Sequence, residues 1–176
     1  MQLDRIALRQ CTVDHASTLA LIGAATFLEA FAGKLDGASI IAHCHKQHAA
    51  EVYRKYLSHP ETRAALALVE PGEAPVGYSL LTAPDLPLGD LNADDIELKR
   101  IYLLSRFQGN GRGNLLMEAA LHAARAMGKQ RILLGVYAKN AKALAFYRKH
   151  GFVQVGTRTF QVGASVFHDL VLGRPL

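Results

Sequence analysis

Cysteine is scarce in this chain of 176 residues. Its two cysteines, Cys11 and Cys44, lie far apart in the sequence and form no C-x-x-C pair. The sequence therefore favours neither a disulfide framework nor a zinc site. A protein that stays reduced in the cytoplasm is the simplest interpretation.

Long apolar runs are absent as well. No stretch approaches the roughly 20 apolar residues that a membrane-spanning helix needs. Asp4 and Arg5 stand where an ordinary signal peptide would begin its apolar core. We therefore expect a cytoplasmic protein with no membrane partner. Internal repeats and low-complexity linkers are also lacking, so the length predicts a single domain over residues 1–176.

Blocks of like charge are missing too. Lysine and arginine number 20 against 15 aspartates and glutamates, which gives a net charge of +5, but the basic residues are scattered. Such a distribution predicts no nucleic-acid partner. The mild positive charge either attracts a phosphate-bearing ligand or simply keeps the protein in solution.

What the chain does have is a glycine-rich turn, Gly109-Asn110-Gly111-Arg112-Gly113. An apolar run typical of a strand (residues 101–104) precedes it, and a periodic run typical of a helix (residues 114–127) follows. Glycine lets backbone N–H groups approach an anion closely, and the helix directs its unpaired N–H groups and its positive dipole end to the same place. The turn predicts a pyrophosphate-binding site.

Two common phosphate-binding motifs do not fit this turn. A Walker loop needs Gly-Lys-Ser/Thr, whereas this turn ends Gly111-Arg112-Gly113-Asn114 and offers no hydroxyl for magnesium. A dinucleotide fingerprint needs G-x-G-x-x-G with an acid about 20 residues later. The spacing here is G-x-G-x-G, and Gly128-Lys129-Gln130 fills the later region. Neither nucleotide class is predicted.

Two spaced motifs give the turn its context. The first is Gln108-x-x-Gly111-x-Gly113, and the second is Asn140-x-x-Ala143-x-x-Phe146-Tyr147-x-x-x-Gly151-Phe152, after an expected strand at 131–138. Together they resemble the two halves of the acetyl-CoA signature of the GNAT superfamily of N-acetyltransferases. This resemblance implies an α/β protein of the α+β type, with a mixed, mostly antiparallel central sheet flanked by helices in the order βααβββαβαββ.

Local sequence patterns predict most of the strands and helices in this order. Alternating apolar residues and turn residues predict strands, and capping residues predict helices that begin at Asp14 and Ser39. The second helical segment is expected to break in its middle and to end before Pro60. The expected ranges are a strand at 3–9, helical segments at 14–31 and 39–57, a hairpin of 66–70 with 75–82, a central strand at 97–103, and short strands at 153–156, 159–162 and 166–172.

The resemblance also implies acetyl-CoA as co-substrate and no metal. By match to motif position, backbone groups of Ile101, Tyr102 and Leu103 would bind the pantetheine arm, and Asn140 would contact it. Lys149 would meet the 3′-phosphate, or it is a solvated helix charge. The residues of the pyrophosphate motif are Gln108, Gly109, Asn110, Gly111, Arg112, Gly113 and Asn114.

Tyr147 is the expected general acid, which protonates the thiolate of CoA. The resemblance places it near the sulfur, and its spacing from Asn140 adds support. Seven residues on a helix return to within about 20° of the same face, so both side chains can address one elongated ligand. The alternative is a core tyrosine on an amphipathic helix.

The general base is less well defined. Glu97, Lys99, Ile101 and Leu103 are expected to share one face of the central strand, because strand side chains alternate. Some GNAT members carry a glutamate on this strand that deprotonates the amine through water, so Glu97 is our hypothesis for the base. An exposed carboxylate at the strand end, paired with Lys99 or Arg100, is the alternative. Another family branch has its base on the following strand, where this chain has Gly135.

Within the superfamily the chain is most similar to the PaiA-like acetyltransferases, through Glu97-Leu98-Lys99-Arg100-Ile101-Tyr102-Leu103 and Leu134-Gly135-Val136-Tyr137. That resemblance implies a polyamine or other small primary amine as acceptor. The carboxylates that could receive such a cation are Glu29, Asp85, Asp90, Asp94, Asp95 and Glu97.

Alternatives stay open at this point. The acceptor could be a protein or peptide amine, or the chain could be a catalytically silent acetyl-CoA sensor. A homodimer is compatible with the family. His43, His45 and His48 do not share one clean helical face, so they do not predict a metal site.

Overall fold

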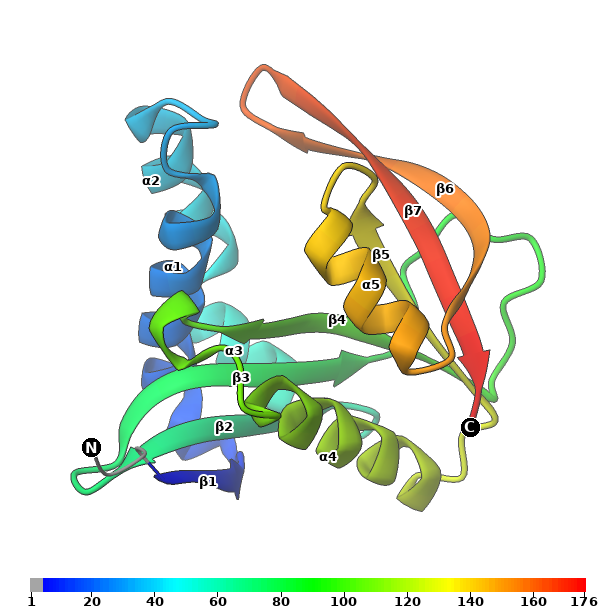
Figure 1. Cartoon of the computed structure of the whole chain (residues 1–176), viewed down its shortest axis with the longest axis horizontal. Coiled ribbons are helices and arrows are strands. Elements are labelled where there is room, and N and C mark those ends of the chain that lie inside the picture. Colours follow the sequence, from blue (N-terminus) through cyan, green and yellow to red (C-terminus); the bar gives the residue numbers. More distant parts are fainter. Residues whose placement is uncertain (1–4) are drawn as a thin grey trace.

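The computed structural model describes residues 5–176 and contains one seven-stranded sheet in the order β1-β2-β3-β4-β5-β7-β6 (Figure 1). The strands are β1 (Arg5–Gln10), β2 (Arg63–Glu70), β3 (Ala74–Thr82), β4 (Asp95–Leu103), β5 (Arg131–Tyr137), β6 (Val153–Val162) and β7 (Ser165–Pro175). The α-helices are α1 (Ala16–Phe31), α2 (Gly37–Gln47), α3 (Ala50–Leu57), α4 (Arg112–Ala126) and α5 (Ala141–Lys149). The expected element order is confirmed, with the second helical segment divided into α2 and α3.

The sheet is antiparallel except where β4 and β5 meet. Helices α4 and α5 pack on one face of it, through a core that includes Met117, Leu144 and Phe152. Helices α1 and α3 cover the other face, where Leu19 and Tyr53 pack against β2 and β3. Figure 1 shows α4 and α5 in front of the sheet, α1 and α2 at its left end, and α3 behind the strands. The mixed, mostly antiparallel sheet that the sequence predicted is confirmed.

Two predicted helix starts are wrong. A 3₁₀ turn (Val13–His15) precedes α1, and the N–H of Thr12 donates to His15 Nδ1 at 3.0 Å, so Asp14 lies inside the turn. The cap of α2 is Asp36, whose side chain accepts a hydrogen bond from the Ser39 N–H at 2.8 Å. Both errors arise because each segment holds several capping residues within a few positions.

The C-terminal strands also differ from the prediction. Two long strands, β6 and β7, replace the three short ones, and they form a hairpin through Gly163. Gly156 does not end a strand. It lies beside a bulge in β6, where a Cβ atom would come within 2.7 Å of Leu88 Cδ2. A larger residue here would have to displace the Leu88 side chain. The predicted first strand, 3–9, begins outside the described residues at Leu3 and Asp4.

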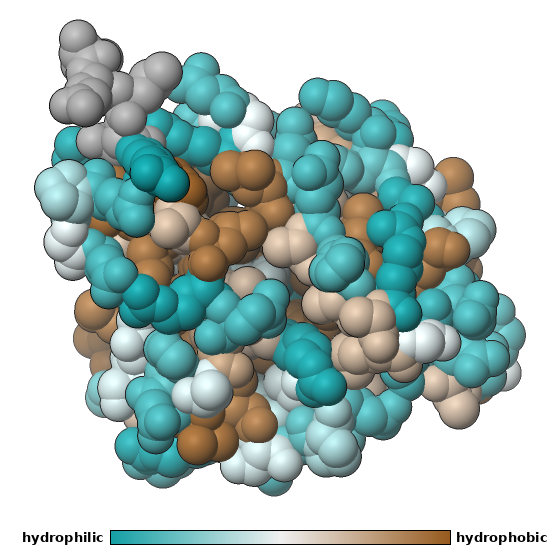
Figure 2. Space-filling view, turned by 90° about the horizontal axis from the view of Figure 1, so that it is seen from below, coloured by the Kyte–Doolittle hydropathy of each residue, from teal (hydrophilic) through white to brown (hydrophobic). Residues whose placement is uncertain are grey.

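The surface view in Figure 2 shows the molecule from below the orientation of Figure 1. Hydrophilic residues cover most of this face, and apolar residues gather in separate patches between them. Apolar atoms make up more than half of the accessible surface of most folded proteins, so apolar residues on this face are ordinary. Among residues 5–176, no helix is both long and apolar enough to cross a membrane.

Candidate active site

The backbone pairing of the sheet splits where β4 and β5 separate, and we call this split the cleft. The two strands pair in parallel only at Asp95↔Arg131, Ile96↔Ile132 and Glu97↔Leu133, and they diverge beyond that point (Figure 1). The rest of β4 therefore lacks a strand on its β5 side within the described part of the chain. Free backbone groups at such an edge can bind an extended ligand in the manner of an added strand. This edge contains Ile101, Tyr102 and Leu103, the residues that the sequence resemblance names for pantetheine.

A β-bulge at Lys99 changes which side chains of β4 share a face. The pairing with β3 shifts register there, because Leu81 faces Leu98 whereas Leu80 faces Arg100. Ile101 and Leu103 consequently lie on the α4 side of the sheet with Ile96 and Leu98. The prediction that Glu97, Lys99, Ile101 and Leu103 share one face is therefore wrong. The inserted residue interrupts the alternation, and Glu97 shares its face with Arg100 and Tyr102.

The glycine-rich turn has the backbone of an anion cradle. Gly109, Asn110 and Gly111 have φ values of +93°, +51° and +75°, all in the left-handed region. The N–H groups of these three residues have no acceptor among residues 5–176. Gly111 caps α4, so the positive end of that helix points to the same place. A row of free N–H groups at a helix start suits a pyrophosphate.

Side chains around the turn connect it to the cleft. Gln108 donates to the Leu103 carbonyl at 2.8 Å and accepts a hydrogen bond from Lys142 on α5. Asn114 contacts His150 at 3.1 Å through Oδ1 and Nε2. A Cβ atom at Gly113 would meet the ring of Phe146 at 3.4 Å, so glycine here allows α5 to pack against the start of α4. The two motifs found in the sequence are thus in contact.

Helix α5 carries Tyr147 on its buried face, near Tyr102 of β4. Asn140 caps the helix through its Oδ1, which accepts from the Ala143 N–H at 3.1 Å. Tyr147 is only 9% exposed and packs edge-on to Phe152. Burial, and to a lesser degree the neighbouring Tyr102, raises the pKa of Tyr147, so its hydroxyl is protonated at neutral pH. That hydroxyl has no hydrogen-bond partner in residues 5–176, and it is not sealed from solvent.

Glu97 lies where the two strands separate and is only 2% exposed. Its Oε2 accepts from the Asp85 N–H at 2.8 Å. Its Oε1 lies 3.9 Å from Lys99 Nζ and 4.0 Å from Arg158 Nη1. The alternative of an exposed strand-end carboxylate is therefore wrong about exposure, although the pairing with Lys99 is present.

Arg158 and Asp169 were not found from the sequence. Arg158 Nε donates to the buried carboxylate of Asp169 at 3.1 Å across the β6–β7 hairpin. The guanidinium lies over Gly135, where any Cβ atom would overlap it. The strand position that carries a base in another family branch is therefore occupied by an arginine from β6. A glycine in the middle of an otherwise apolar strand was the available signal.

A second group missed by sequence reasoning lies on the α1 side of β4. Arg100 Nη1 donates to the Tyr53 hydroxyl at 2.9 Å, and that oxygen also lies 2.9 Å from His48 Nδ1 and 3.3 Å from the Tyr78 hydroxyl. Burial, with the charge of Arg100, lowers the pKa of His48 to about 3 and that of His43 to about 4. Both imidazoles are therefore neutral at pH 7.

Aromatic side chains surround this group. Phe27 on α1 stacks on His43 of α2, with ring centroids 4.0 Å apart, and on Phe31 at 4.4 Å. Phe160 and Phe167 approach edge-on from the β6–β7 hairpin. The histidines are thus packed among rings. Residues 5–176 contain no group of three or more His, Cys, Asp and Glu side chains that could hold a metal ion.

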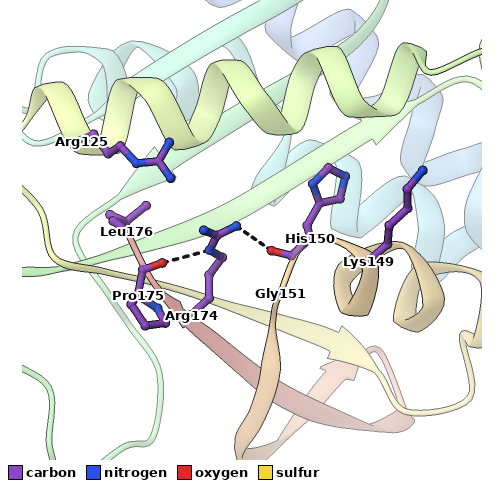
Figure 3. Close-up of a pocket in the computed structure, with 7 residues that line it drawn as sticks. All are labelled: Arg125, Lys149, His150, Gly151, Arg174, Pro175 and Leu176. Carbon is purple, nitrogen blue, oxygen red and sulfur yellow. Dashed lines mark hydrogen bonds between the residues drawn. The ribbon is translucent and has the colours of Figure 1, made fainter.

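Lys149 borders an open cavity of about 760 Å³ (Figure 3). Its other basic residues are Arg125 from α4, His150 and Arg174, and Arg174 donates to the His150 carbonyl at 2.6 Å. Arg125, Lys149 and Arg174 would all favour an anion, whereas burial lowers the pKa of His150, which therefore adds no charge at neutral pH. Asn114, near the start of α4, contacts His150, which lines this cavity. A phosphate group beyond the pyrophosphate site would find positive charge here.

The loop before β4 is less available to a cation than the sequence suggested. Arg131 donates to Asp90 at 2.8 Å and to Asp95 at 2.7 and 2.8 Å, and these contacts lower the pKa of both carboxyls. Glu29 instead binds Ser105, at 2.9 Å to its N–H and 2.8 Å to its hydroxyl. Three of the six carboxylates expected at the acceptor end therefore hold the fold together.

A model of the acetyltransferase (GNAT) family matches residues 27–152, which include the cleft, the glycine-rich turn and Tyr147. The chain belongs to this family. It is an acetyl-CoA-dependent N-acetyltransferase, and acetyl-CoA is its co-substrate. The cradle of free N–H groups and the open edge of β4 fit that co-substrate, which supplies the activated acetyl group.

Relatives of the acetyltransferase support the assignment. An uncharacterized N-acetyltransferase of Mycobacterium tuberculosis (strain ATCC 25618 / H37Rv) is 39% identical over 124 residues, which cover 70% of this chain and 74% of the relative. A mycothiol acetyltransferase of Corynebacterium glutamicum (strain R) matches a shorter segment. It is 41% identical over 59 residues, which cover 32% of this chain and 20% of that protein.

Solved structures confirm the GNAT fold. The PaiA N-acetyltransferase of Thermoplasma acidophilum, in complex with coenzyme A, superposes with a TM-score of 0.73 at 18% identity over 98% of this chain and 99% of that one. A GNAT-family acetyltransferase of Streptococcus pneumoniae gives 0.71 at 24% identity over 98% and 100% of the two chains. At these identities the likeness shows the fold alone.

Proposed function

We propose that the acetyltransferase moves the acetyl group directly from acetyl-CoA to a small primary amine, with Tyr147 as the general acid. The observation that carries this proposal is the hydroxyl of Tyr147, which is protonated, lies near Tyr102 of β4 and has no partner in the described chain. A donor in that state can protonate a leaving thiolate. A core tyrosine with a structural role would be expected to spend its hydroxyl on a protein partner.

We infer that the chain binds acetyl-CoA at three places. The edge of β4 at Ile101, Tyr102 and Leu103 would bind the pantetheine arm through backbone groups. The turn from Gln108 to Asn114 would hold the pyrophosphate. Lys149, with the other basic residues of the cavity in Figure 3, would attract the 3′-phosphate. The side chain of Asn140 would contact the pantetheine arm, and its Oδ1 caps α5 and so fixes the start of the helix that carries Tyr147.

Glu97 remains our proposal for the general base, acting through water. Its carboxylate lies on the α1-side face of β4, at the residue where β4 and β5 separate. An amine that enters the cleft from that side would pass near it. The proposal requires the carboxylate to work despite its contacts with Asp85, Lys99 and Arg158.

The acceptor is proposed as a small primary amine, and the polyamine within that class stays a prediction. Its support is the sequence resemblance to PaiA-like proteins, and a PaiA structure shares the fold. Against it, Arg131 engages Asp90 and Asp95, so Asp85 and Asp94 are the carboxylates of this loop that have no ion pair in residues 5–176. A polycation would therefore find little negative charge.

The test is release of free thiol from acetyl-CoA in the presence of an amine. Spermidine, spermine, short diamines, amino acids, amino-acid amides and an N-terminal peptide form the panel, at pH 7 and pH 9. Turnover with a small amine supports the proposal. Turnover with the peptide alone would replace the small amine by a protein α-amine. Acetyl-CoA binding without turnover for any acceptor would favour the sensor alternative.

Substitution of Tyr147 by phenylalanine tests the mechanism. Tyr147→Phe should lower kcat about 100-fold or more while the Kd of acetyl-CoA changes little, because general acid catalysis contributes roughly 10²–10⁴ to rate. Tyr137→Phe is the matched control, since it removes a hydroxyl from the neighbouring strand β5. Equal kcat values for wild type and Tyr147→Phe would refute the assignment.

A further inference from the structure

The positively charged side chains around the cleft differ in whether they have a carboxylate partner. Lys99 and Arg158 both approach Glu97, Arg158 also binds Asp169, and Arg131 binds Asp90 and Asp95. Arg100 has no carboxylate within salt-bridge distance among residues 5–176. It is half-buried on β4, one residue beyond the bulge. A partly desolvated charge without a counter-ion is unusual in a folded protein.

The side chain of Arg100 is nevertheless held in place. Its Nη1 donates to the Tyr53 hydroxyl at 2.9 Å, and its guanidinium carbon lies 5.3 Å from the ring centroid of Tyr53 and 5.8 Å from that of Tyr56. Tyr53 is fixed in turn by His48 and Tyr78. Stacking and one hydrogen bond thus orient the guanidinium before any ligand arrives.

Two of the three guanidinium nitrogens of Arg100 remain available to bind a ligand. Nε and Nη2 of Arg100 have no acceptor in the described chain, and neither is sealed from solvent. The neighbouring imidazoles of His43 and His48 are neutral at pH 7, so they add no second charge. An arginine whose Nε and Nη2 are both free and whose plane is fixed suits bidentate binding of an oxyanion.

We propose that Arg100 binds an oxyanion of the acceptor, so that the substrate is a primary amine that also carries a carboxylate or a chemically similar group. This inference rests on the proposed function, because it names the class of amine that enters the same cleft. Arg100 shares the face of β4 with Tyr102 and Glu97, and β4 has already separated from β5 there. Phe27, Phe31 and Phe160 line the neighbouring region and suit an apolar body between the two polar groups.

The experiment compares acceptors that differ in one group. Glycine, L-alanine, L-phenylalanine and L-glutamate are measured beside their α-carboxamides with the intact protein and saturating acetyl-CoA. The wild type should have a KM about 10- to 100-fold lower for the acid than for its amide, as expected for a charge-assisted bidentate contact. Arg100→Gln should abolish this difference by raising the KM of the acid, and Arg100→Lys should leave part of it because the charge remains.

Arg54→Gln is the matched control, because Arg54 is an exposed arginine on α3 that is paired with Glu51. It should leave the preference intact. The Kd of acetyl-CoA and the melting temperature, measured for each variant, separate a local effect from misfolding. An equal rise of KM for acid and amide in Arg100→Gln would overturn the inference, as would a wild type that prefers the amides or the polyamines. Either result would leave the proposed acetyl transfer standing.

Calorimetry separates failure of this inference from failure of the proposed function. Each amino acid is titrated into the protein in the presence of CoA, with no chemistry required. Binding that Arg100→Gln weakens about tenfold or more supports the oxyanion site even if turnover fails. Absence of binding for all four acids overturns the inference whatever turnover shows.

Discussion

At the scale of single residues, Glu97 connects the proposed chemistry to the observed contacts. It is buried, yet its only hydrogen bond in residues 5–176 is the one from the Asp85 N–H, and two cations stand about 4 Å away. The same geometry could serve a base or an ion-pair scaffold for Arg158. Only a measurement that separates turnover from stability distinguishes the two roles.

Glu97→Gln keeps the size of the side chain and its ability to accept from Asp85. We expect kcat with the best acceptor to fall about 100-fold near pH 7, and to recover at pH 9 where more of the amine is already neutral. Glu118→Gln on the exposed side of α4 is the control and should leave kcat unchanged at both pH 7 and pH 9. A large drop in melting temperature with no pH-dependent recovery would assign Glu97 to the scaffold instead.

Residue-level prediction from the sequence succeeded where a motif is local. Gln108, Gly111 and Gly113 lie within one turn, and Asn140 and Tyr147 within one helix, so their spacing in sequence fixes their spacing in space. The group formed by Arg100, His48 and Tyr53 could not be found this way. Its members come from β4, from the junction of α2 and α3, and from α3 itself, and tertiary packing alone brings them together.

At the scale of elements, the bulge at Lys99 decides which side chains of β4 lie on the α4 side of the sheet and which lie on the α1 side. Strand periodicity predicts one face for Glu97, Lys99 and Ile101, and one additional residue reverses that assignment. A bulge is set by pairing with β3, which a single strand's sequence does not reveal. The turn at Gly109 to Gly113, by contrast, follows from glycine content, because left-handed backbone there excludes most other residues.

The contribution of the turn to binding can be separated from its contribution to stability. Gly111 and Gly128 both have left-handed φ values, +75° and +74°, at opposite ends of α4. Alanine at either position should destabilise the fold by about 1 kcal/mol because of backbone strain. Only Gly111→Ala should also weaken acetyl-CoA binding, by about tenfold or more, since only Gly111 belongs to the cradle.

Calorimetry with acetyl-CoA and thermal unfolding of both variants check this prediction. The melting temperatures should fall by similar amounts. If the Kd of acetyl-CoA also changes equally in the two variants, the effect is general loosening of α4, and the cradle would have to be placed elsewhere.

At the scale of the whole molecule, two hydrophobic layers and a split sheet create the site. The layer of α4 and α5 carries the motifs that the sequence reveals, and the layer of α1 to α3 carries the histidine, tyrosine and arginine group that it does not. The order of helices and strands was predictable because the spacing of apolar residues along each segment is typical of either a helix or a strand. Acceptor selection depends on how the two layers meet at β4, which is a property of the fold.

That second layer also makes stability depend on pH. His48 is 6% exposed and its pKa is lowered to about 3, mainly by burial, whereas an unfolded histidine titrates near 6.5. The unfolded state therefore binds an extra proton between these values, so stability is full above pH 6.5 and is lost as the pH falls toward 3. At pH 5 this one group should lower the free energy of unfolding by about 2 kcal/mol relative to pH 7.5.

Urea unfolding at pH 7.5 and pH 5.0 measures this difference for the wild type and for His48→Gln, whose amide can still reach the Tyr53 hydroxyl. His48→Gln should be less stable than wild type at pH 7.5 but should lose about 2 kcal/mol less on acidification. His122→Gln, on the exposed side of α4, should follow the wild type at both pH values. An unchanged pH difference in His48→Gln would mean that this histidine is protonated in the folded protein. A second positive charge would then lie beside Arg100, and its attraction for an oxyanion would rise as the pH falls.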